Sequence, residues 1–401
     1  MSPSEVTTHH TNTAASPPFD PELLDRLLDE AGVDCVLATS PHNVRYLLGG
    51  YRFFLYDRLD PIGPSRYLPV VGHLKGRAGE DFYIGAGNED WGTGAHPLWV
   101  GSVQNASWST TQAAELAAEA LRRLGLERGR IGIEPAFLPA DAIATLTAAL
   151  PAASFVNVAL ELDELRAVKS EEELQTMRAG ANAVVESMLA TFAAVDEGWS
   201  TGEIVELFRQ EQTRRGLTFD YCLIAAGSSI NRAPSDIRLR PGDVLSLDSG
   251  ADMNGYTADL TRMGILGEPT RRHQDLLGQV EAVQTAVRAV IGAGRRGGDL
   301  FEVAAETIDG LPDGGSMSFL AHGTGLLTHE APRLTATGSP PYPATHRDRP
   351  LQASSVLSVE THVIDSEVGF VKLEDTIIVG EETFEPVGDS GRGWNPIGAG
   401  R

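Results

Sequence analysis

Residues 244–262 read Val244-Leu-Ser-Leu-Asp248-Ser-Gly250-Ala-Asp-Met-Asn254-Gly255-Tyr-Thr-Ala-Asp259-Leu-Thr-Arg262 and predict a β-hairpin. Residues 243–249 alternate with the period of a strand, residues 256–264 form a second strand, and Asn-Gly between them favours a two-residue turn. With that turn, Met253 pairs with Tyr256, and Asp259 lies opposite Gly250. The carboxylates of Asp248 and Asp259 then become diagonal neighbours on one face of the sheet.

Two carboxylates at this distance repel each other unless a cation lies between them, so the hairpin favours a metal site. The alternative is a pair of acidic residues on the solvated face of a hairpin. Glu360 and Glu374 also lie in apolar, β-branched runs, where burial without a cation is costly. They share a face only if the loop between their strands has an odd number of residues or a bulge occurs, and we expect that geometry.

His322 lies in Ala321-His-Gly-Thr-Gly325, where small residues let another group approach the ring. A lone histidine is more often a packed or solvent-facing residue than a ligand. Together with the four carboxylates, however, it completes an oxygen-rich set with one nitrogen, which suits a pair of divalent ions such as Mn²⁺ better than a structural zinc. Four carboxylates would balance the charge of two such ions, and a metal-bound water has its pKa lowered to about 7.

Composition narrows the class of protein. A chain of 401 residues with 42% apolar residues indicates two globular domains. The formal charge of −23 argues against nucleic acid or an anionic membrane as a partner. No apolar run has the length of a membrane span, and the first residues lack the pattern of a signal peptide, so a cytoplasmic enzyme is expected. Cys35 and Cys222 are read as buried thiols.

The chain divides into three predicted parts. Residues 1–18 are rich in Ser, Thr, Pro and His and predict a disordered tail. Residues 19–160 alternate between helix and strand, as in an α/β domain. Residues 161–401 show two long helices, strands, two more helices and more strands, which indicates an internal duplication. Two helices are predicted to begin at capping boxes: Ser170 with Glu173, and Ser200 with Glu203.

The candidate ligands follow one another at a characteristic spacing: Asp248, Asp259, His322, His329, Glu360 and Glu374. With these residues the chain resembles the creatinase/prolidase/aminopeptidase P metallopeptidases. Asn43-Val-Arg-Tyr-Leu and Leu165-Arg-Ala-Val-Lys-Ser-Glu-Glu-Glu-Leu resemble the family's amino-terminal motif and the start of its catalytic domain. The resemblance implies an α+β protein: a pita-bread domain, with a curved antiparallel sheet, flanking helices and a pseudo-twofold axis, after a smaller α/β domain.

The resemblance also implies the chemistry. It predicts a homodimer that hydrolyses Xaa-Pro or similar amides with two divalent ions, Mn²⁺ being expected and Co²⁺ or Zn²⁺ the alternatives. Asp248 would chelate one ion, Asp259 and Glu374 would bridge both, and His322 and Glu360 would bind the other. Glu360 would also be the general base for a bridging water, and His329 would bind the substrate or the developing oxyanion. Arg333 would pair with a substrate carboxylate, or is a surface arginine.

Three positions depart from the family pattern. Ile230-Asn231 stands where peptidases of the family carry a Pro-His proton donor, Glu360-Thr-His-Val replaces Glu-Pro-Gly, and Lys372 replaces an arginine. Asn231 is therefore a candidate substrate-binding residue, and the substrate could be a small peptide or an amino-acid derivative. Two other functions remain open: hydrolysis of a non-peptide C–N bond, as in a cyclic amidine, and a metal-free binding module.

Overall fold

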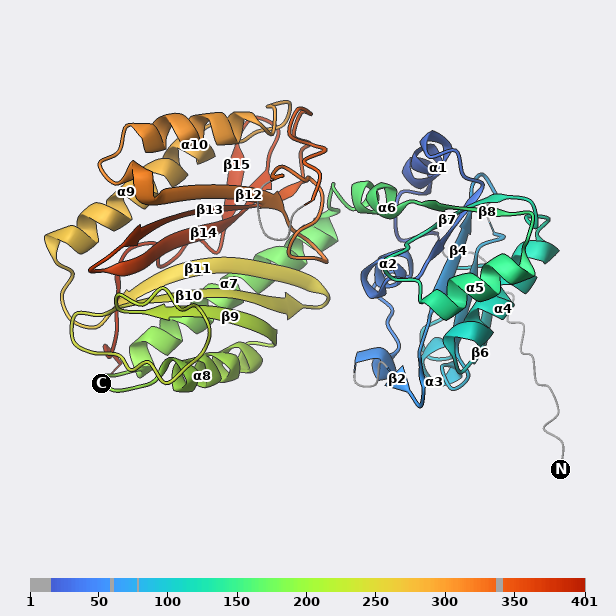
Figure 1. The fold of residues 1–401 in the computed structure, drawn as a ribbon, viewed down its shortest axis with the longest axis horizontal. Helices are drawn as coiled ribbons and strands as arrows, with labels where there is room; N and C mark the ends of the chain where they lie inside the picture. Colours follow the sequence, from blue (N-terminus) through green and yellow to red (C-terminus); the bar gives the residue numbers. More distant parts are fainter. Residues whose placement is uncertain (1–15, 58–60, 78, 337–341, 401) are drawn as a thin grey trace. The chain divides into compact units, whose positions relative to one another are not determined.

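A computed structural model describes residues 16–57, 61–77, 79–336 and 342–400. The chain forms two compact units, Met1–Leu165 and Arg166–Arg401, here called the N-terminal and C-terminal units (Figure 1). Of the predicted disordered tail, residues 1–15 lie outside the described residues. None of the helices in the described ranges is long and apolar enough to cross a membrane.

The N-terminal unit contains a six-stranded mixed sheet in the order β6-β5-β4-β1-β7-β8. Its strands are β1 (Cys35–Ala38), β4 (Val70–Leu74), β5 (Phe82–Ala86), β6 (Ser102–Ser107), β7 (Arg130–Ile133) and β8 (Ser154–Asn157), with a separate small ribbon of β2 (Pro61–Ile62) and β3 (Ser65–Arg66). Its helices are α1 (Pro21–Glu30), α2 (Pro41–Leu47), η1 (Phe54–Asp57), α3 (Asp90–Thr93), α4 (Thr110–Arg123), α5 (Ala140–Ala149) and α6 (Ala159–Leu165).

Both faces of this sheet are covered. In β1, Cys35 and Leu37 belong to an apolar cluster with residues of α4 and α5, while Val36 and Ala38 belong to a cluster with residues of α1 and α2. Successive residues of a strand point to opposite faces, so a strand buried on both sides is apolar throughout. All four residues of β1 are buried.

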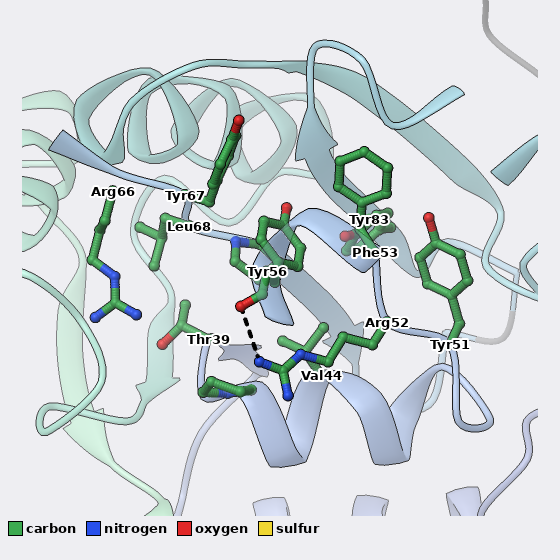
Figure 2. A pocket seen from close by; sticks show the side chains of 12 residues that line it. Thr39, Val44, Tyr51, Arg52, Phe53, Tyr56, Arg66, Tyr67, Leu68 and Tyr83 are labelled. Carbon is green, nitrogen blue, oxygen red and sulfur yellow. Dashed lines mark hydrogen bonds between the residues drawn. The ribbon is translucent and has the colours of Figure 1, made fainter. Parts of the chain in front are cut away.

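Five of the twelve residues that line a cavity of the N-terminal unit are aromatic (Figure 2). The guanidinium of Arg52 donates a hydrogen bond of 3.2 Å to the carbonyl of Tyr56. Beside it, the buried carboxylate of Glu89 accepts hydrogen bonds from the hydroxyls of Tyr83 at 2.6 Å and Tyr51 at 3.0 Å. These hydrogen bonds satisfy the buried carboxyl group of Glu89.

The two units divide after Leu165, whereas the sequence places the domain boundary after residue 160. Helix α6 carries Leu162 and Leu165, which are buried in the cluster that includes Leu24 and Leu28 of α1. The apolar side chains of α6 therefore pack in the N-terminal unit, although α6 lies just before the capping box of α7 in the sequence.

The C-terminal unit is built on a sheet of eight strands, with the path β12-β13-β14-β11-β10-β9, β15 on β14 and β16 on β11. The strands are β9 (Thr218–Ala226), β10 (Val244–Met253), β11 (Tyr256–Ile265), β12 (Met317–Gly323), β13 (Val356–Asp365), β14 (Gly369–Val379), β15 (Phe384–Val387) and β16 (Asn395–Pro396). The helices are α7 (Glu171–Ala194), α8 (Thr201–Arg214), α9 (Arg271–Arg288), α10 (Asp299–Asp309) and η2 (Gly314–Ser316).

The order of two helices followed by three strands occurs twice in this unit, as the sequence predicts. Helices α7 and α8 pack on β9, β10 and β11, and helices α9 and α10 pack on β12, β13 and β14 (Figure 1). Both predicted capping boxes, at Ser170 and at Ser200, are formed.

The predicted hairpin is confirmed. Met253 pairs with Tyr256, and Gly250 lies opposite Asp259. Asn254 and Gly255 have φ values of 52° and 94°, which is the conformation that a tight hairpin turn of this type requires.

The expected geometry of the other strand pair is confirmed too. Glu360 lies directly opposite Glu374, and Asp365 lies opposite Gly369. The connecting loop is residues 366–368, an odd number, so the two glutamates share a face.

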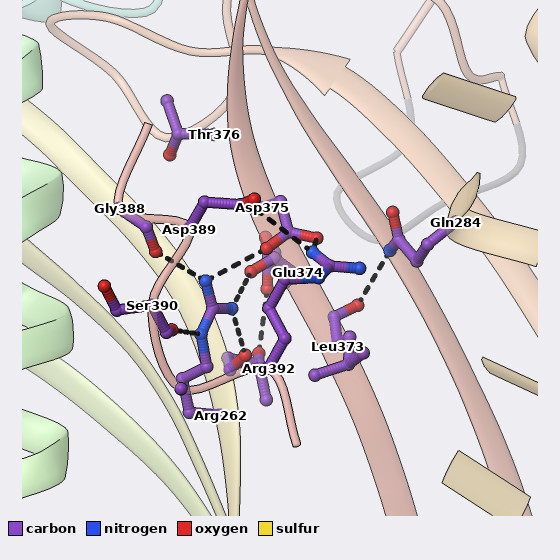
Figure 3. A network of polar contacts seen from close by, with 12 residues as sticks. Arg262, Gln284, Leu373, Glu374, Asp375, Thr376, Gly388, Asp389, Ser390 and Arg392 are labelled. Carbon is purple, nitrogen blue, oxygen red and sulfur yellow. Dashed lines mark hydrogen bonds and ion pairs between the residues drawn. The ribbon is translucent and has the colours of Figure 1, made fainter. Parts of the chain in front are cut away.

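The two halves of the sheet meet between β11 and β14, where Thr261 pairs with Glu374. Arg262, which is fully buried, donates hydrogen bonds to the carbonyls of Thr261 at 2.8 Å and Glu374 at 2.9 Å (Figure 3). It also donates to the carbonyls of Gly388 and Ser390, both at 2.6 Å. One guanidinium thus satisfies carbonyl groups where the two strands diverge.

Candidate metal centre

The five candidate metal ligands come from five strands of the C-terminal unit. Asp248 lies on β10, Asp259 on β11, His322 on β12, Glu360 on β13 and Glu374 on β14. The two aspartates are diagonal neighbours and the two glutamates face each other. Because Thr261 of β11 pairs with Glu374, both acidic pairs lie at the junction of the two halves of the sheet.

The structure groups three of these residues where they could hold one ion, and Asp248 and Glu360 lie outside that group. Asp259, His322 and Glu374 each offer a ligand atom, and the three atoms lie within 4.8 Å of one another. The Nε2 atom of His322 lies 3.8 Å from Oε1 of Glu360 and 3.9 Å from Oε1 of Glu374. All five ligands except Glu360, which is partly exposed, are buried.

Neighbouring hydroxyls hold Glu374 in place. Ser358 donates a hydrogen bond of 2.7 Å to Oε1 of Glu374, and Thr261 donates one of 3.1 Å to Oε2. Ser358 lies two residues before Glu360 on β13, so both side chains point to the same face. The carboxylate is therefore oriented before any ligand arrives.

Two cationic side chains lie among the carboxylates. Nζ of Lys372 lies 2.5 Å from Oε2 of Glu360 and 2.7 Å from both Oε2 of Glu374 and Oδ2 of Asp248. The Arg232 guanidinium forms an ion pair with Asp248. In the sequence, Lys372 stands out only as a departure from the family pattern. Its position two residues before Glu374 already puts it on the same face of the strand. Arg232 lies in the loop before β10, and no sequence signal marks it.

Asp259 carries the clearest sign that a cation belongs here. Burial, and then the charges of Glu374 and Asp248, raise the pKa of Asp259 well above its ordinary value. Its Oδ1 atom is buried without a hydrogen-bond partner among the described residues. For Glu374, burial raises the pKa, but Lys372, His322 and the hydrogen bond from Ser358 together outweigh this effect, and the net shift is downward. An oxygen-rich set with one imidazole and an unsatisfied carboxylate oxygen fits a divalent ion.

The proposed substrate-binding residues have different positions. The ring of His329 stacks on that of His322, with centroids 3.7 Å apart, and its Nδ1 lies 3.1 Å from the hydroxyl of Tyr342. The guanidinium of Arg333 lies over the ring of Tyr342, 4.8 Å from its centroid. Asn231 is exposed, and its side chain bonds the backbone of Ala233. The structure therefore brings His329 to the centre, while Asn231 faces solvent.

The fold and the centre define a class: a two-unit α+β protein whose second unit carries a buried carboxylate and histidine centre suited to divalent metal. Comparison with known sequences specifies the family. The pattern of metallopeptidase family M24 matches residues 175–381, and that of the creatinase/prolidase N-terminal domain matches residues 22–168. The chain belongs to metallopeptidase family M24, has the pita-bread fold, and is a metal-dependent peptidase.

Individual relatives agree with this assignment. A Bacillus subtilis (strain 168) protein, described as the uncharacterized peptidase YqhT, is 26% identical over 370 residues, which cover 90% of this chain and 95% of that protein. An Xaa-Pro dipeptidase from Bacillus anthracis has a similar structure, with a TM-score of 0.78 at 22% identity over 94% of this chain and 99% of its own. A prolidase from Pyrococcus furiosus gives a TM-score of 0.73 at 19% identity, over 91% of this chain and 99% of its own. At these identities the structural likeness establishes the fold.

Proposed function

We propose that the protein hydrolyses the amide bond of short peptides of the Xaa-Pro type at a centre for two divalent ions. The observation that carries the proposal is the convergence of Asp259, His322 and Glu374, whose ligand atoms lie within 4.8 Å of one another. The solved relatives named as an Xaa-Pro dipeptidase and a prolidase support the choice of substrate.

In this proposal Asp248 would hold one ion, His322 and Glu360 would hold the other, and Asp259 and Glu374 would contribute to both. A divalent ion at such a site polarises a substrate carbonyl and lowers the pKa of a bound water to about 7. Glu360 is the general base, and its position supports this role: its side chain is 15% exposed, against 2% for Glu374.

His329 is the proposed group that binds the substrate carbonyl. Burial, and then the neighbouring His322, lowers the pKa of His329 to about 3, so its imidazole is neutral at pH 7. A neutral imidazole has one N–H donor and can stabilise negative charge that develops on a carbonyl oxygen. Arg333, whose guanidinium lies over the ring of Tyr342, is the proposed partner of a substrate carboxylate.

Turnover of a defined peptide panel tests the proposal. Purified protein loaded with Mn²⁺ is assayed on Xaa-Pro dipeptides, on tripeptides that begin with Xaa-Pro, and on the corresponding Xaa-Ala peptides. We expect turnover of at least one Xaa-Pro class and a loss of at least ~100-fold in His322→Ala, because a metal ligand is removed. His96→Ala, an exposed residue of the N-terminal unit, is the matched control. Absence of turnover on every peptide would exclude the Xaa-Pro assignment.

A second candidate is hydrolysis of a small non-peptide C–N bond. It is favoured by Asn231, which stands at the family's proton-donor position and is turned outward onto its own loop. Asn231→His tests it, because restoring an ionisable donor should create or raise peptidase activity if the native substrate is not a peptide. Unchanged peptide turnover in this variant would count against the second candidate.

Three finer features stay predictions: the preference for Mn²⁺, the homodimer and the cytoplasmic location. Sedimentation analysis of the purified protein measures the oligomeric state. Comparison of Mn²⁺, Co²⁺ and Zn²⁺ in the same peptide assay, each at matched occupancy, measures the metal preference.

A further inference from the structure

The face of the sheet that carries the candidate ligands continues past them toward the other end of β13. His362 follows Glu360 by two residues on this strand, so both side chains point to the same face. On β14, Phe370 precedes Lys372 by two residues and points to that face as well. His362 lies opposite Lys372, and the centroids of the His362 and Phe370 rings are 5.0 Å apart. A partly exposed imidazole thus lies against an aromatic ring beside the centre.

Arg232 joins these two rings from the loop before β10. Its guanidinium carbon lies 4.7 Å from the centroid of the Phe370 ring, and its Nη2 donates to Asp248. A guanidinium has five N–H donors, and the Arg232 side chain is 32% exposed. Arg232 can therefore keep its pair with Asp248 and still donate to a bound molecule. Arg232, His362 and Phe370 are here called the His362 shelf.

The His362 shelf and His329 lie at opposite ends of the centre. His362 pairs across the sheet with Ser318, which comes four residues before His322 on β12. Four residues of a strand span roughly 13 Å. The ring of His329 instead stacks on that of His322, and its segment follows the end of β12. A substrate held at the centre therefore meets different side chains on its two sides.

We infer that the His362 shelf is the specificity site for the residue before the scissile bond, and that it selects a side chain ending in a carboxylate. The inference rests on the proposed function, in which Arg333 pairs with a substrate carboxylate. In an Xaa-Pro dipeptide the terminal carboxylate belongs to the proline. The residue before the proline then lies on the other side of the scissile bond, at the shelf, and Asp-Pro and Glu-Pro peptides are the preferred substrates.

Hydrogen bonding and charge both favour an acidic side chain at the shelf. The guanidinium of Arg232 matches the planar shape of a carboxylate, and the imidazole of His362 has at least one N–H donor in either protonation state. The carboxylates next to the shelf are already paired with cations. Asp248 is paired with both Arg232 and Lys372. Glu360 is paired with Lys372 as well, so neither acid repels an incoming carboxylate with its full charge.

Matched peptide pairs test the inference. The full-length protein loaded with Mn²⁺ is assayed on Glu-Pro against Gln-Pro and on Asp-Pro against Asn-Pro, which differ in charge and hardly in shape. We expect kcat/KM to be about 10-fold higher for each acidic peptide, mainly through a lower KM, because the amide cannot form the charge-assisted hydrogen bonds. The preference should shrink as the ionic strength rises. Equal kcat/KM values within both pairs would overturn the inference.

Variants of the shelf locate the preference. In Arg232→Gln the ratio of kcat/KM between Glu-Pro and Gln-Pro should fall to about one, whatever the overall rate, because the charge that distinguishes the two peptides is removed. His362→Ala, at a partly exposed position, should lower the ratio as well and serves if Arg232→Gln does not fold. Arg238→Gln is the matched control: this arginine lies in the same loop, is 59% exposed and donates to the carbonyl of Gly198 at 2.6 Å. It should keep the wild-type ratio, and an unchanged ratio in the folded shelf variants would also overturn the inference.

Calorimetry separates this inference from the proposed function. Should no peptide be hydrolysed, the affinities of the Mn²⁺-loaded protein for Glu-Pro and Gln-Pro are measured directly. Tighter binding of Glu-Pro that is lost in Arg232→Gln would support the shelf and overturn only the proposed reaction. Equal or undetectable binding of the two peptides would overturn the shelf too. Turnover of Xaa-Pro peptides without an acidic preference would overturn the shelf alone.

Discussion

Gly250 of β10 pairs with Tyr221 of β9, and the ring of Tyr221 packs against Gly250. A Cβ atom on Gly250 would lie 2.4 Å from Cε1 and 2.8 Å from Cζ of Tyr221. Burial, and then the charge of Asp259, raises the pKa of the Tyr221 hydroxyl, which therefore stays protonated beside this candidate ligand. The absence of a side chain at position 250 is what gives the ring access to the centre.

Gly250→Ala should therefore destabilise the protein. The added methyl group has to displace the partly buried ring of Tyr221, and overpacking of this kind costs about 1–3 kcal/mol. Gly278→Ala is the matched control, since Gly278 lies on α9 and an added methyl group there would meet no described atom beyond its own helix within 4 Å. That change should be neutral or stabilise by up to ~1 kcal/mol. Urea denaturation of both variants measures the difference, and equal midpoints would contradict the argument.

Glu330 lies next to His329 and forms a buried ion cluster. Its Oε1 is 3.0 Å from Nζ of Lys169 and its Oε2 is 3.2 Å from Nε of Arg166, and all three residues are at most 3% exposed. Burial raises the pKa of Glu330, but the two cations outweigh this effect and hold it below its ordinary value. The carboxylate is thus charged and fully paired in the folded protein.

Glu330→Gln should cost about 3–5 kcal/mol of unfolding free energy, because the carboxylate charge that pairs with two buried cations is removed. Glu385→Gln removes the same charge from a pair with Arg178 in which the Glu385 side chain is 47% exposed, and it should cost at most ~1 kcal/mol. Chemical denaturation of the two variants compares the costs. A loss at Glu330 no larger than at Glu385 would show that the buried cluster adds no stability.

Sequence periodicity places the four candidate carboxylates on shared faces because strand geometry fixes where their side chains point. The Asn254-Gly255 turn sets the register of Asp248 and Asp259, and an odd loop sets that of the two glutamates. Tyr221 and Arg232 are not found in this way. They reach the centre from the edge strand β9 and from a loop, and their approach depends on how these segments pack.

At the scale of elements, the least predictable feature is the junction between β11 and β14. More than one hundred residues separate Thr261 from its partner Glu374, and no local pattern predicts that their strands are neighbours. Strand β6, with the polar sequence Ser-Val-Gln-Asn-Ala-Ser, likewise lacks the alternation that predicts a strand. The pairing of β11 with β14 and the presence of β6 as a strand both depend on how the whole sheet packs.

Arg262 should be irreplaceable at that junction. Its guanidinium donates to four carbonyl groups and forms an ion pair of 3.0 Å with the buried Asp375 (Figure 3). Arg262→Lys keeps the charge but has three donors on one atom, so buried carbonyls are left unpaired at a cost of at least ~3 kcal/mol. Arg271→Lys, whose side chain is 95% exposed, should change stability by less than ~0.5 kcal/mol. Thermal unfolding compares the two, and similar melting temperatures would refute the proposed role.

At the scale of the molecule, the alternation of helices and strands predicts the N-terminal unit, and the doubled order of helices and strands predicts the C-terminal unit. The sequence does not predict that β1 pairs with β4 in the antiparallel direction, whereas it pairs with β7 in the parallel direction. That strand brings His73 into the interior, between two aspartates from different parts of the chain. The buried charge of the N-terminal unit thus follows from topology rather than from local sequence.

His73 should make the stability of the protein depend on pH. Its Nδ1 lies 3.0 Å from Asp81 and its Nε2 lies 3.1 Å from Asp25. Burial lowers the pKa of His73, but the two carboxylates outweigh it, so the folded pKa lies above the ordinary value of 6.5. A raised pKa means that the folded state binds the proton more tightly than the unfolded state. The stabilisation is therefore fully present below pH 6.5 and is lost as the pH rises through the folded pKa.

Thermal unfolding at a series of pH values measures this effect as the difference in melting temperature between the wild type and His73→Gln, which cannot be protonated. We expect the difference to be largest below pH 6.5 and to shrink as the pH rises above it. His96→Gln, at an exposed position of the same unit, should show no such trend. A difference that stays constant across the series would mean that His73 contributes by packing alone, because only a change in protonation links its contribution to pH.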